Sequence, residues 1–506
     1  MSDQSGRRSA SRSAPWSAPR SAIVDLGSNS VRLVVFEGRG RNPVAIFNEK
    51  AVLRLGRGLA STGRLNEAGV AQGLRVMARY HAIARAMGAD PFEVLATAAV
   101  RDASNGPEFV ASLQARMPGV PIRVLSGDEE AALSSAGVLC GIPEADGVMA
   151  DIGGGSLEVV RVGVQDGGPP LAASLGLGVI RLSDRAEGDL ARARAIAEAD
   201  LGEVPWLAQG DGRDLYLVGG AWRALARVQM HLTNYPLHIV HHYTIGRDAG
   251  RDLAAQVLAS PRRVLERLTG APRRRVEDLP FAATVLRRLL RQTNARRVVF
   301  SANGIREGWF MQQVPPEVRA EDPVVALGHD IAARYGRDVR LPPALLDWTA
   351  PLFPEETGPQ ARLRAAACWM SDIGSQDHPD YRAEQAFLRV LRQPGVAMGH
   401  PARAFLALTL ALRYEAELDA PFLSIGRALL DPTAVGRAEV LGTALRLAYT
   451  LSAGTPELLA GANLRVLPGR LTLRLAEGSG VFGGDGIQRR LARLGAAMGL
   501  AVDEAG

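Results

Sequence analysis

Two short segments of this chain repeat the pattern Asp-x-Gly-x-x-Ser, one at residues 25–30 and the other at residues 151–156. Each stands between two short runs of β-forming residues, such as 22–24 and 31–36 around the first copy. A polar, glycine-containing segment between two such runs predicts a β-hairpin with a polar tip. Because the pattern occurs twice with similar flanks, we expect two related lobes whose hairpin tips form one cleft.

The residues at these tips suit a phosphate group. Glycine lets main-chain amides come close to an anion, and Ser and Asn donate further hydrogen bonds. The aspartates that begin the two tips can hold Mg²⁺ directly or through water. Ordinary Gly/Ser turns are the alternative, and the repetition counts against them. The predicted phosphate-binding residues of the tips are Asp25, Gly27, Ser28, Asn29, Gly153, Gly154, Gly155 and Ser156.

Two later segments repeat the order of strand, glycine turn and helix. The strand at 215–218 ends in Gly219 and Gly220, and residues 298–308 show the same order again. Helix N-termini that are reached through glycines bind anions by their free amides and their dipole. We therefore add Gly219 and Gly220 to the phosphate-binding set, and we expect two α/β lobes whose loops converge.

Arg101 and Glu130 are the candidate catalytic residues. Arg101 follows a predicted buried strand at the edge where open α/β sheets collect ligands, so it is either a phosphate contact or the partner of an acid in a salt bridge. Ser126 and Glu129 have the spacing of a capping box, which leaves Glu130 without a local partner. Its carboxylate can then project into the cleft as a general base, with a solvent-facing glutamate as the alternative.

Composition excludes several classes of protein. The 506 residues suffice for about three domains, and no stretch approaches the ~18–20 apolar residues of a membrane helix. We expect a cytoplasmic protein that binds neither a membrane nor a nucleic acid. With only Cys140 and Cys368 there is no disulfide framework and no cysteine-rich zinc site. The histidines His238, His241 and His242 stand among Ile, Val and Tyr, which favours strand and loop positions over a metal site.

The positive charge of the chain comes almost entirely from arginine. Lys50 is the only lysine among 59 basic residues, and about half of the formal net charge of +6 lies in residues 1–20. The Ser, Arg and Pro of this segment predict a disordered tail, with a transit peptide as the weaker alternative. Coding bias accounts for the preference for arginine, but guanidinium groups also suit an anionic substrate.

The character of the chain changes near residue 315 to long helices rich in Leu, Ala and Arg. We expect helices at 361–373, 381–392, 402–417 and 434–452, then a hairpin at 464–475 and a last helix near 486–499. The predicted division is a basic tail at 1–20, lobe I at 21–135, lobe II at 136–312, a helical domain at 313–453 and a small C-terminal domain at 454–506.

The ordered series of motifs resembles the exopolyphosphatase and guanosine pentaphosphate phosphohydrolase (Ppx/GppA) family. The motifs lie at 22–36, 96–105, 126–133, 148–160, 215–220 and 300–308. The resemblance implies an α/β fold of two actin-like lobes, of the ribonuclease H-like, sugar kinase and chaperone ATPase superfamily. It also implies an all-α HD-like domain, a small α/β appendage at the C-terminus, and a homodimer.

The same resemblance assigns roles to single residues. It implies that Asn29 bonds a terminal phosphate and that Arg101 clamps one. It further implies that Asp151 and Glu158 hold Mg²⁺ (or Mn²⁺) and that Glu130 is the catalytic glutamate. The Glu130 assignment agrees with the argument from the capping box.

The helical domain departs from the HD pattern. Where HD phosphohydrolases have an adjacent His-Asp pair, this chain has Ser371 and Asp372. One aspartate with the scattered His378 or His400 does not make the required cluster. We therefore interpret this domain as a scaffold that walls a substrate channel.

The function implied is exopolyphosphatase activity, the hydrolytic release of terminal orthophosphate from inorganic polyphosphate. A long domain with many arginines favours a path for a polyanion. The alternatives are hydrolysis of the 5′-γ-phosphate of guanosine pentaphosphate, a non-catalytic sensor of polyphosphate or (p)ppGpp, and a sugar or acetate-type kinase. The acids Glu130, Asp151 and Glu158 speak against a sensor, because a pure anion-binding cleft gains nothing from three carboxylates.

Overall fold

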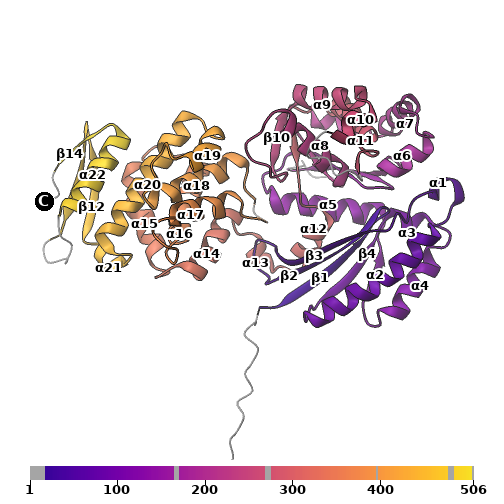
Figure 1. Cartoon of the computed structure of the whole chain (residues 1–506), viewed down its shortest axis with the longest axis horizontal. Helices are drawn as coiled ribbons and strands as arrows, with labels where there is room; N and C mark the ends of the chain where they lie inside the picture. Colours follow the sequence, from indigo (N-terminus) through magenta and orange to yellow (C-terminus); the bar gives the residue numbers. More distant parts are fainter. Residues whose placement is uncertain (1–17, 164–169, 268–274, 395–396, 477–483, 504–506) are drawn as a thin grey trace, which may run out of the picture.

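The computed structural model describes residues 18–163, 170–267, 275–394, 397–476 and 484–503 of the chain. The predicted tail lies outside the described residues as far as residue 17, and Arg20 already begins the first strand. Two α/β lobes lie one above the other, and a helical part with a small sheet at its far end extends beside them (Figure 1).

Lobe I is built on a five-stranded sheet in the order β3-β2-β1-β4-β5. Its strands are β1 (Arg20–Leu26), β2 (Ser30–Glu37), β3 (Val44–Val52), β4 (Phe92–Ala96) and β5 (Ile122–Val124). Its helices are α1 (Leu59–Thr62), α2 (Glu67–Ala86), α3 (Ala98–Asp102) and α4 (Gly106–Arg116). The first three strands are antiparallel neighbours, and β4 and β5 run parallel to β1. The hairpin predicted around the first Asp-x-Gly-x-x-Ser segment is therefore confirmed.

Lobe II repeats this plan with one extra edge strand, in the order β10-β11-β9-β6-β7-β8. Its strands are β6 (Gly147–Ile152), β7 (Leu157–Val162), β8 (Ala172–Leu175), β9 (Asp214–Val218), β10 (Tyr243–Gly246) and β11 (Arg297–Phe300). Its helices are α6 (Val179–Arg185), α7 (Leu190–Gly202), α8 (Gly220–Leu232), α9 (Arg247–Ala259), α10 (Arg262–Arg267) and α11 (Leu279–Thr293), with a 3₁₀ helix at Pro205–Gly210. Without β10, the strand order and directions match those of lobe I. The two related lobes expected from the repeated motif are present.

Two helices, α5 (Gly127–Gly141) and α12 (Ile305–Gln312), form a layer between the two sheets (Figure 1). On one side Phe310 packs against Phe36 of lobe I with ring centroids 4.8 Å apart, and on the other side Val138 belongs to a core shared with Met149 of lobe II. A Cβ atom on Gly308 would lie only 1.9 Å from the carbonyl oxygen of Leu133, so glycine permits the close crossing of the two helices. Helix α12 comes from the range assigned to lobe II and packs on the sheet of lobe I.

Local sequence signals account for the starts of two helices near the cleft. The Asn66 side chain caps α2 by accepting a hydrogen bond of 3.0 Å from the amide of Gly69. Ser126 and Glu129 form the predicted capping box at the start of α5. Because Glu129 is engaged there, the next residue, Glu130, is left to turn inward.

The helical part follows α12. Its helices are α13 (Pro316–Arg319), α14 (Pro323–Tyr335), α15 (Leu341–Thr349), α16 (Gly358–Met370), α17 (Arg382–Leu391), α18 (His400–Arg413), α19 (Ser424–Ala428) and α20 (Pro432–Ser452), with 3₁₀ helices at Ala350–Leu352 and Pro421–Leu423. The end of the chain adds α21 (Pro456–Leu459), β12 (Ala462–Leu467), β13 (Arg470–Leu475), α22 (Asp485–Met498) and β14 (Ala501–Val502). All four long helices, the hairpin and the last helix lie close to their predicted positions. Within the described ranges, no helix combines the length and apolar character needed to cross a bilayer.

Three aromatic side chains join lobe II to the helical part. The Tyr235 hydroxyl lies 2.8 Å from Nδ1 of His400, and Nε2 of His400 lies 3.3 Å from the carbonyl oxygen of His241. Burial lowers the pKa of His241 to about 3 and that of His400 to about 4, so both rings are neutral at physiological pH. This joint between the two parts is thus a packed contact of neutral rings, with the buried guanidinium of Arg403 nearby.

Candidate active site

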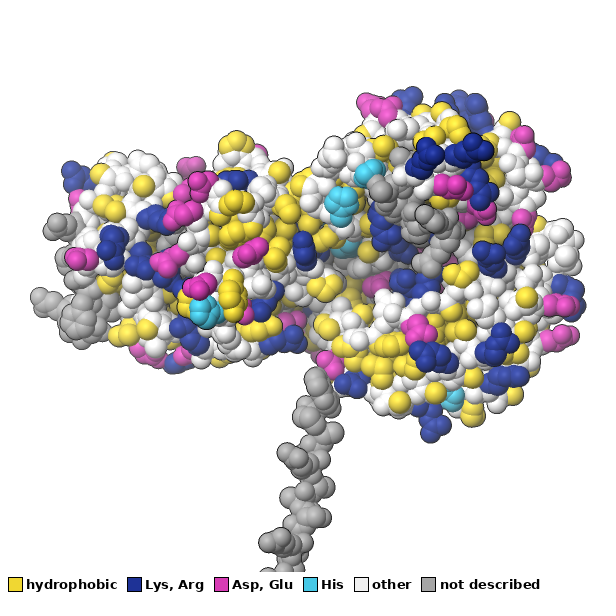
Figure 2. Space-filling model, viewed as in Figure 1, with side chains coloured by type: hydrophobic (Ala, Val, Ile, Leu, Met, Phe, Trp, Pro, Cys, Tyr) yellow, Lys and Arg dark blue, Asp and Glu magenta, His cyan; other side chains and the backbone are white. Residues whose placement is uncertain are grey.

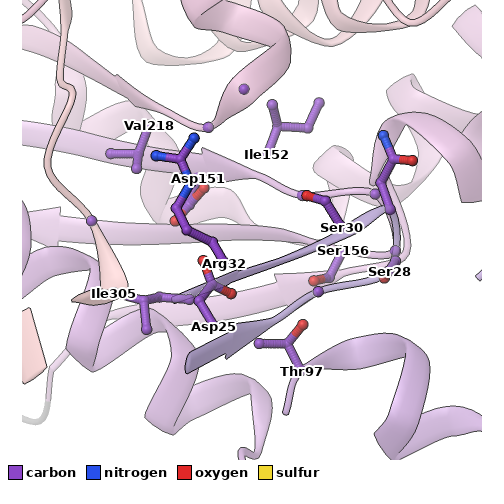
Figure 3. A pocket seen from close by; sticks show the side chains of 18 of the residues that line it. Asp25, Ser28, Ser30, Arg32, Thr97, Asp151, Ile152, Ser156, Val218 and Ile305 are labelled. Atoms are coloured by element: carbon purple, nitrogen blue, oxygen red, sulfur yellow. The ribbon is translucent and has the colours of Figure 1, made fainter. Parts of the chain in front are cut away.

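A cleft between the lobes brings the predicted phosphate-binding residues together. All ten of them line it, and Glu130 and Asp151 line it as well. Asp25 at the end of β1 and Asp151 at the end of β6 lie in this one cleft, together with the side chain of Arg32 (Figure 3). The two hairpin tips therefore meet, as the sequence pattern predicted.

The two tips have the same turn and touch one another. The amide of Gly27 donates to the carbonyl oxygen of Ser30 at 3.1 Å, and the amide of Gly153 donates to that of Ser156 at 3.0 Å. A Cβ atom on Gly155 would lie 2.8 Å from the Ser28 hydroxyl oxygen of the other lobe. A larger residue would push the tips apart, so glycine at this point permits the cleft to close around a small group.

Three buried carboxyl groups face this region. Burial, and then the charges of Glu158 and Asp151, raise the pKa of Glu130 well above its usual value. Burial also raises the pKa of Asp151, and burial and then the charge of Asp151 raise that of Glu158 to about 7. Asp151 and Glu158 have hydroxyl partners, since Ser134 donates to Oδ2 of Asp151 and Ser174 donates to Oε1 of Glu158 at 2.9 Å. Because burial and mutual repulsion raise these pKa values, negative charge on all three groups at once is costly.

Arg101 lies beside Glu130. Its Nη1 is 3.3 Å from Oε2 of Glu130 and donates to the carbonyl oxygen of Leu125 at 2.8 Å, while its Nε is 3.3 Å from Oδ1 of Asp102. Neither Arg101 nor Glu158 is among the described residues that line the cleft. The salt bridge that the sequence left open as an alternative is present, and the role of Arg101 as a phosphate clamp stays a prediction.

Five cationic side chains line the cleft and were not predicted as site residues: Arg32, Lys50, Arg223, Arg275 and Arg306. Burial and the nearby charges of Arg306 and Arg32 lower the pKa of Arg223 to about 10. Burial and Arg306 also lower the pKa of Arg32. Crowded cations of this kind are relieved by an anion between them. The sequence held one signal for Arg32, because it lies two residues after the first tip. Its side chain lines the same cleft as that of Asp25, the residue opposite it on the neighbouring strand.

These cations extend outward along the sheet of lobe I. Cross-strand pairing places Asp25 of β1 opposite Arg32 of β2, and Arg32 opposite Lys50 of β3. Across the cleft, Arg275 of lobe II forms a salt bridge of 2.8 Å with Asp278. Burial raises the pKa of Asp278, and the charges of Arg275 and Lys50 offset part of that rise. Arg32 and Lys50 therefore form a row of cations beside the first tip, and Lys50 lies near enough to Asp278 of lobe II to act on its charge.

The acids suit a small divalent cation that brings part of its own coordination shell. In the part of the chain that the structure describes, no three His, Cys, Asp or Glu side chains converge to hold a metal ion. Mg²⁺ is typically bound by one or two carboxylates together with waters and substrate phosphates. Asp151 on the cleft wall and Glu158 behind it, both with raised carboxyl pKa values, fit such a site.

The helical domain places its HD-like residues apart from one another. Asp372 is buried and pairs with Arg337 at 2.9 Å and with Arg413 at 3.7 Å. His378 is exposed, and His400 lies in the joint with lobe II. Asp372 thus has an arginine partner on each side, and the interpretation of this domain as a scaffold stays a prediction.

Comparison with known proteins identifies relatives of both the two lobes and the helical part. Residues 34–317 match the model of the Ppx/GppA phosphatase family, and residues 326–503 match that of the exopolyphosphatase C-terminal domain. Exopolyphosphatase 1 of Mycobacterium tuberculosis is 35% identical over 167 residues, which is 32% of this chain and 48% of the relative. Exopolyphosphatase 2 of the same organism is 33% identical over 178 residues, covering 33% and 54%. The chain thus matches about half the length of these curated relatives.

Solved structures show the same fold in the lobes. An exopolyphosphatase from Cytophaga hutchinsonii has a TM-score of 0.52 and 21% identity over 58% of this chain and 99% of its own. The Aquifex aeolicus member of the Ppx/GppA family has a TM-score of 0.50 and 21% identity, over 58% and 97%. These likenesses support the two-lobed α/β fold expected from the sequence. Because the family model covers more than half of the residues, the chain belongs to the Ppx/GppA phosphatase family.

Proposed function

We propose that this protein is an exopolyphosphatase, which hydrolyses the terminal phosphoanhydride of inorganic polyphosphate and releases orthophosphate. The observation that carries the proposal is the composition of the cleft. Two glycine tips and three mutually repelling arginines, Arg32, Arg223 and Arg306, face a buried glutamate. Such a site binds a terminal phosphate and places a proton acceptor beside it.

The chain's own groups would bind and orient the substrate. Free amides of the two tips and the hydroxyls of Ser28 and Ser156 donate to the oxygens of the terminal phosphate. The guanidinium groups of the cleft neutralise the charge that develops on the leaving phosphate as the bridging P–O bond breaks. The cation row through Arg32 and Lys50 receives the phosphates that follow.

Glu130 would accept a proton from the attacking water. The water oxygen forms the new P–O bond, the bridging oxygen leaves with the shortened chain, and the proton passes to the Glu130 carboxylate. Because burial raises the pKa of this group, it needs neighbouring positive charge to be ionised. Arg101 lies 3.3 Å away, lowers that pKa and fixes the orientation of the carboxylate.

A divalent cation would be held by Asp151 and Glu158, with Mg²⁺ preferred and Mn²⁺ as the alternative. When bound it supplies charge neutralisation between these acids and the phosphate oxygens. The raised carboxyl pKa values of both residues support a cation here, because two buried acids next to a phosphate otherwise repel it.

The test is Glu130→Gln on a panel of polyphosphate and guanosine pentaphosphate. We expect wild type to release orthophosphate from long polyphosphate with the higher kcat/KM, and the variant to bind polyphosphate normally but turn over at least ~10²-fold more slowly. Near-normal turnover in the variant would refute the role of Glu130. Binding without turnover of either substrate by wild type would favour a sensor, and a preference for guanosine pentaphosphate would favour the other activity of the family.

The family assignment also supports several properties of the whole molecule. We expect a homodimer in the cytoplasm, in which the helical part acts as an HD-like scaffold along the substrate path. Light scattering of the full chain at low and high concentration tests the dimer. A kinase would need an adenosine pocket, and ATP-dependent transfer of phosphate to an acceptor would reveal one.

A further inference from the structure

The outer face of lobe II carries a hollow that shares no residue with the cleft. Six arginines and one leucine line it, namely Arg194 of α7, Arg247 and Arg251 of α9, and Arg287, Arg288, Leu290 and Arg291 of α11. We call it the arginine hollow. Figure 2 shows basic side chains gathered over the part of lobe II where α9, α10 and α11 lie. Three helices from distant parts of the chain thus converge to place cations around one depression.

The positive charge of the hollow is not balanced by acids. Glu198 pairs with Arg288 at 3.0 Å and with Arg291 at 3.5 Å, and Asp248 lies 3.9 Å from Arg251. The other three arginines of the hollow have no carboxylate partner within the described residues. Coding bias explains why these residues are arginine and not lysine, but it does not explain why they converge.

Two of the arginines are held in costly surroundings. Arg288 is only 6% exposed, and burial together with the charges of Arg194 and Arg291 lowers its pKa. The Nε of Arg247 is buried without a hydrogen-bond partner in the described part of the chain. A buried donor that lacks an acceptor destabilises the fold, and like charges add to that cost. An anion in the hollow would provide the missing acceptors.

We infer that the arginine hollow is a second binding site for inorganic polyphosphate, which holds a distant part of a long chain while its end lies in the cleft. Guanidinium groups bind phosphate oxygens in pairs, and a polymer with a charge on every unit can use several of them at once. Occupying two sites with one chain raises the effective concentration at each. The inference rests on the proposed function, because it takes polyphosphate as the substrate.

The test compares two triple variants of equal charge. Arg194→Gln, Arg251→Gln and Arg287→Gln change exposed side chains of the hollow. The control set, Arg75→Gln, Arg85→Gln and Arg116→Gln, changes exposed arginines of α2 and α4 in lobe I, which have no carboxylate partner among the described residues. Binding of fluorescently labelled long polyphosphate is measured by anisotropy, and hydrolysis of long polyphosphate and of tripolyphosphate is measured by phosphate release.

We expect the hollow variant to bind long polyphosphate about tenfold more weakly than wild type, the size expected from three surface ion contacts. Its turnover of tripolyphosphate stays at the wild-type rate, and the control variant matches wild type in both assays. Equal binding by wild type and the hollow variant, or equal losses in both variants, would overturn the inference. So would a single-stranded DNA of matched charge that binds through the same three arginines as tightly as polyphosphate, because the hollow would then be a nucleic-acid site.

The two proposals fail in different ways. If wild type does not hydrolyse polyphosphate but binds it through the hollow, the proposed function is wrong and the binding site remains. If wild type hydrolyses it and the hollow variant behaves like the control, only the second site is wrong.

Discussion

The two hairpins of the cleft share a strand pairing but differ at two positions behind the aspartate of each tip. In lobe I, Asp25 is paired across the strands with Arg32, and Arg32 with Lys50. In lobe II, the equivalent row is Asp151, Glu158 and Ser174. The first row therefore places two cations behind the tip, and the second places an acid and a hydroxyl there.

This difference assigns complementary tasks to two lobes of the same fold. A cationic row next to a glycine tip binds phosphate oxygens directly, whereas paired acids bind phosphate only through a cation. Repetition of the hairpin supplies two sets of main-chain donors around one cleft, and the side chains behind each tip decide what each set can hold. The comparison leads to four tests in addition to the Glu130 variant.

The largest effect is expected from changes at the matched positions Glu158 and Arg32. Glu158→Gln should raise the Mg²⁺ concentration for half-maximal activity by up to about 100-fold, since it removes a charge from the metal side. Arg32→Gln should instead raise KM for polyphosphate about tenfold or more at saturating Mg²⁺, because a charged hydrogen bond to substrate is lost. Steady-state kinetics in which metal and substrate are varied separately measures both. The same kinetic change in the two variants would contradict the division of tasks.

Contact between the tips should be the next most sensitive feature. Gly155→Ala places a methyl group only 2.8 Å from the Ser28 hydroxyl oxygen, so the tips must move apart. Overpacking of this kind costs about 1–3 kcal/mol, and we expect kcat/KM to fall about tenfold. Gly40→Ala is the matched control, because a Cβ there meets no atom within 4 Å. If both variants keep wild-type activity, the tips do not need to touch.

Lys50 allows a smaller and more specific test of the cation row. Lys50→Gln should raise KM for polyphosphate about threefold, as expected for one half-buried ion contact near the surface, and Lys50→Arg should restore it. Because this is the only lysine of the chain, amine acylation followed by peptide mapping reports on it and on the N-terminus alone. Polyphosphate should protect Lys50 from acylation. Unchanged labelling at saturating polyphosphate would remove Lys50 from the substrate path.

The lobes also differ in how they contact the helical part, and among the described residues only the contact made by lobe II contains groups that titrate as the pH falls. Lobe I donates hydrogen bonds from Arg41 to the carbonyl oxygen of Glu321 at 3.1 Å and from Asn42 to that of Pro323 at 2.8 Å, which do not titrate near neutral pH. Lobe II contacts the helical part where His241 meets His400 of α18, and the pKa values of these two histidines are lowered to about 3 and about 4. Arg403 and His242 also face these rings and favour their neutral form.

Since the unfolded pKa of histidine is higher, near 6.5, the stabilising effect of the neutral rings is complete above about pH 6.5 and is lost as the pH falls toward their folded values. We expect the free energy of unfolding to drop by about 1–2 kcal/mol per histidine at pH 5, with little effect on activity near pH 7. Denaturant unfolding at pH 7 and pH 5 measures this. His400→Gln should reduce the difference in the free energy of unfolding between pH 7 and pH 5. The same difference in wild type and variant would exclude this joint as its source.

Local signals in the sequence predicted the parts of the site that depend on neighbouring residues. The tips, the capping box at Ser126 and the inward turn of Glu130 all follow from patterns within about eight residues, which short-range sterics and hydrogen bonding decide. The pairing of Arg101 with Glu130 was left open, because it depends on the burial of Glu130 by lobe II. A buried carboxylate needs a partner, and only the assembled cleft shows which one.

Features that depend on long-range register could not be predicted in this way. Lys50 reaches the row of Arg32 only through the pairing of β2 with β3, which includes an irregularity between Val35 and Phe36. Helix α12 returns to the sheet of lobe I because Phe310 completes a core there, although its sequence follows lobe II. Convergence of arginines from three helices in the hollow is likewise a property of packing and leaves no motif in the chain.

The central claim is that both tips bind one phosphate group. A crystal structure of the Glu130→Gln variant with Mg²⁺ and tripolyphosphate tests it most directly. We predict a terminal phosphate within hydrogen-bond distance of main-chain amides from both tips, the one that contains Asn29 and the one that contains Gly154, with the cation against Asp151. A phosphate that contacts one tip only, or that binds outside the cleft, would contradict the account.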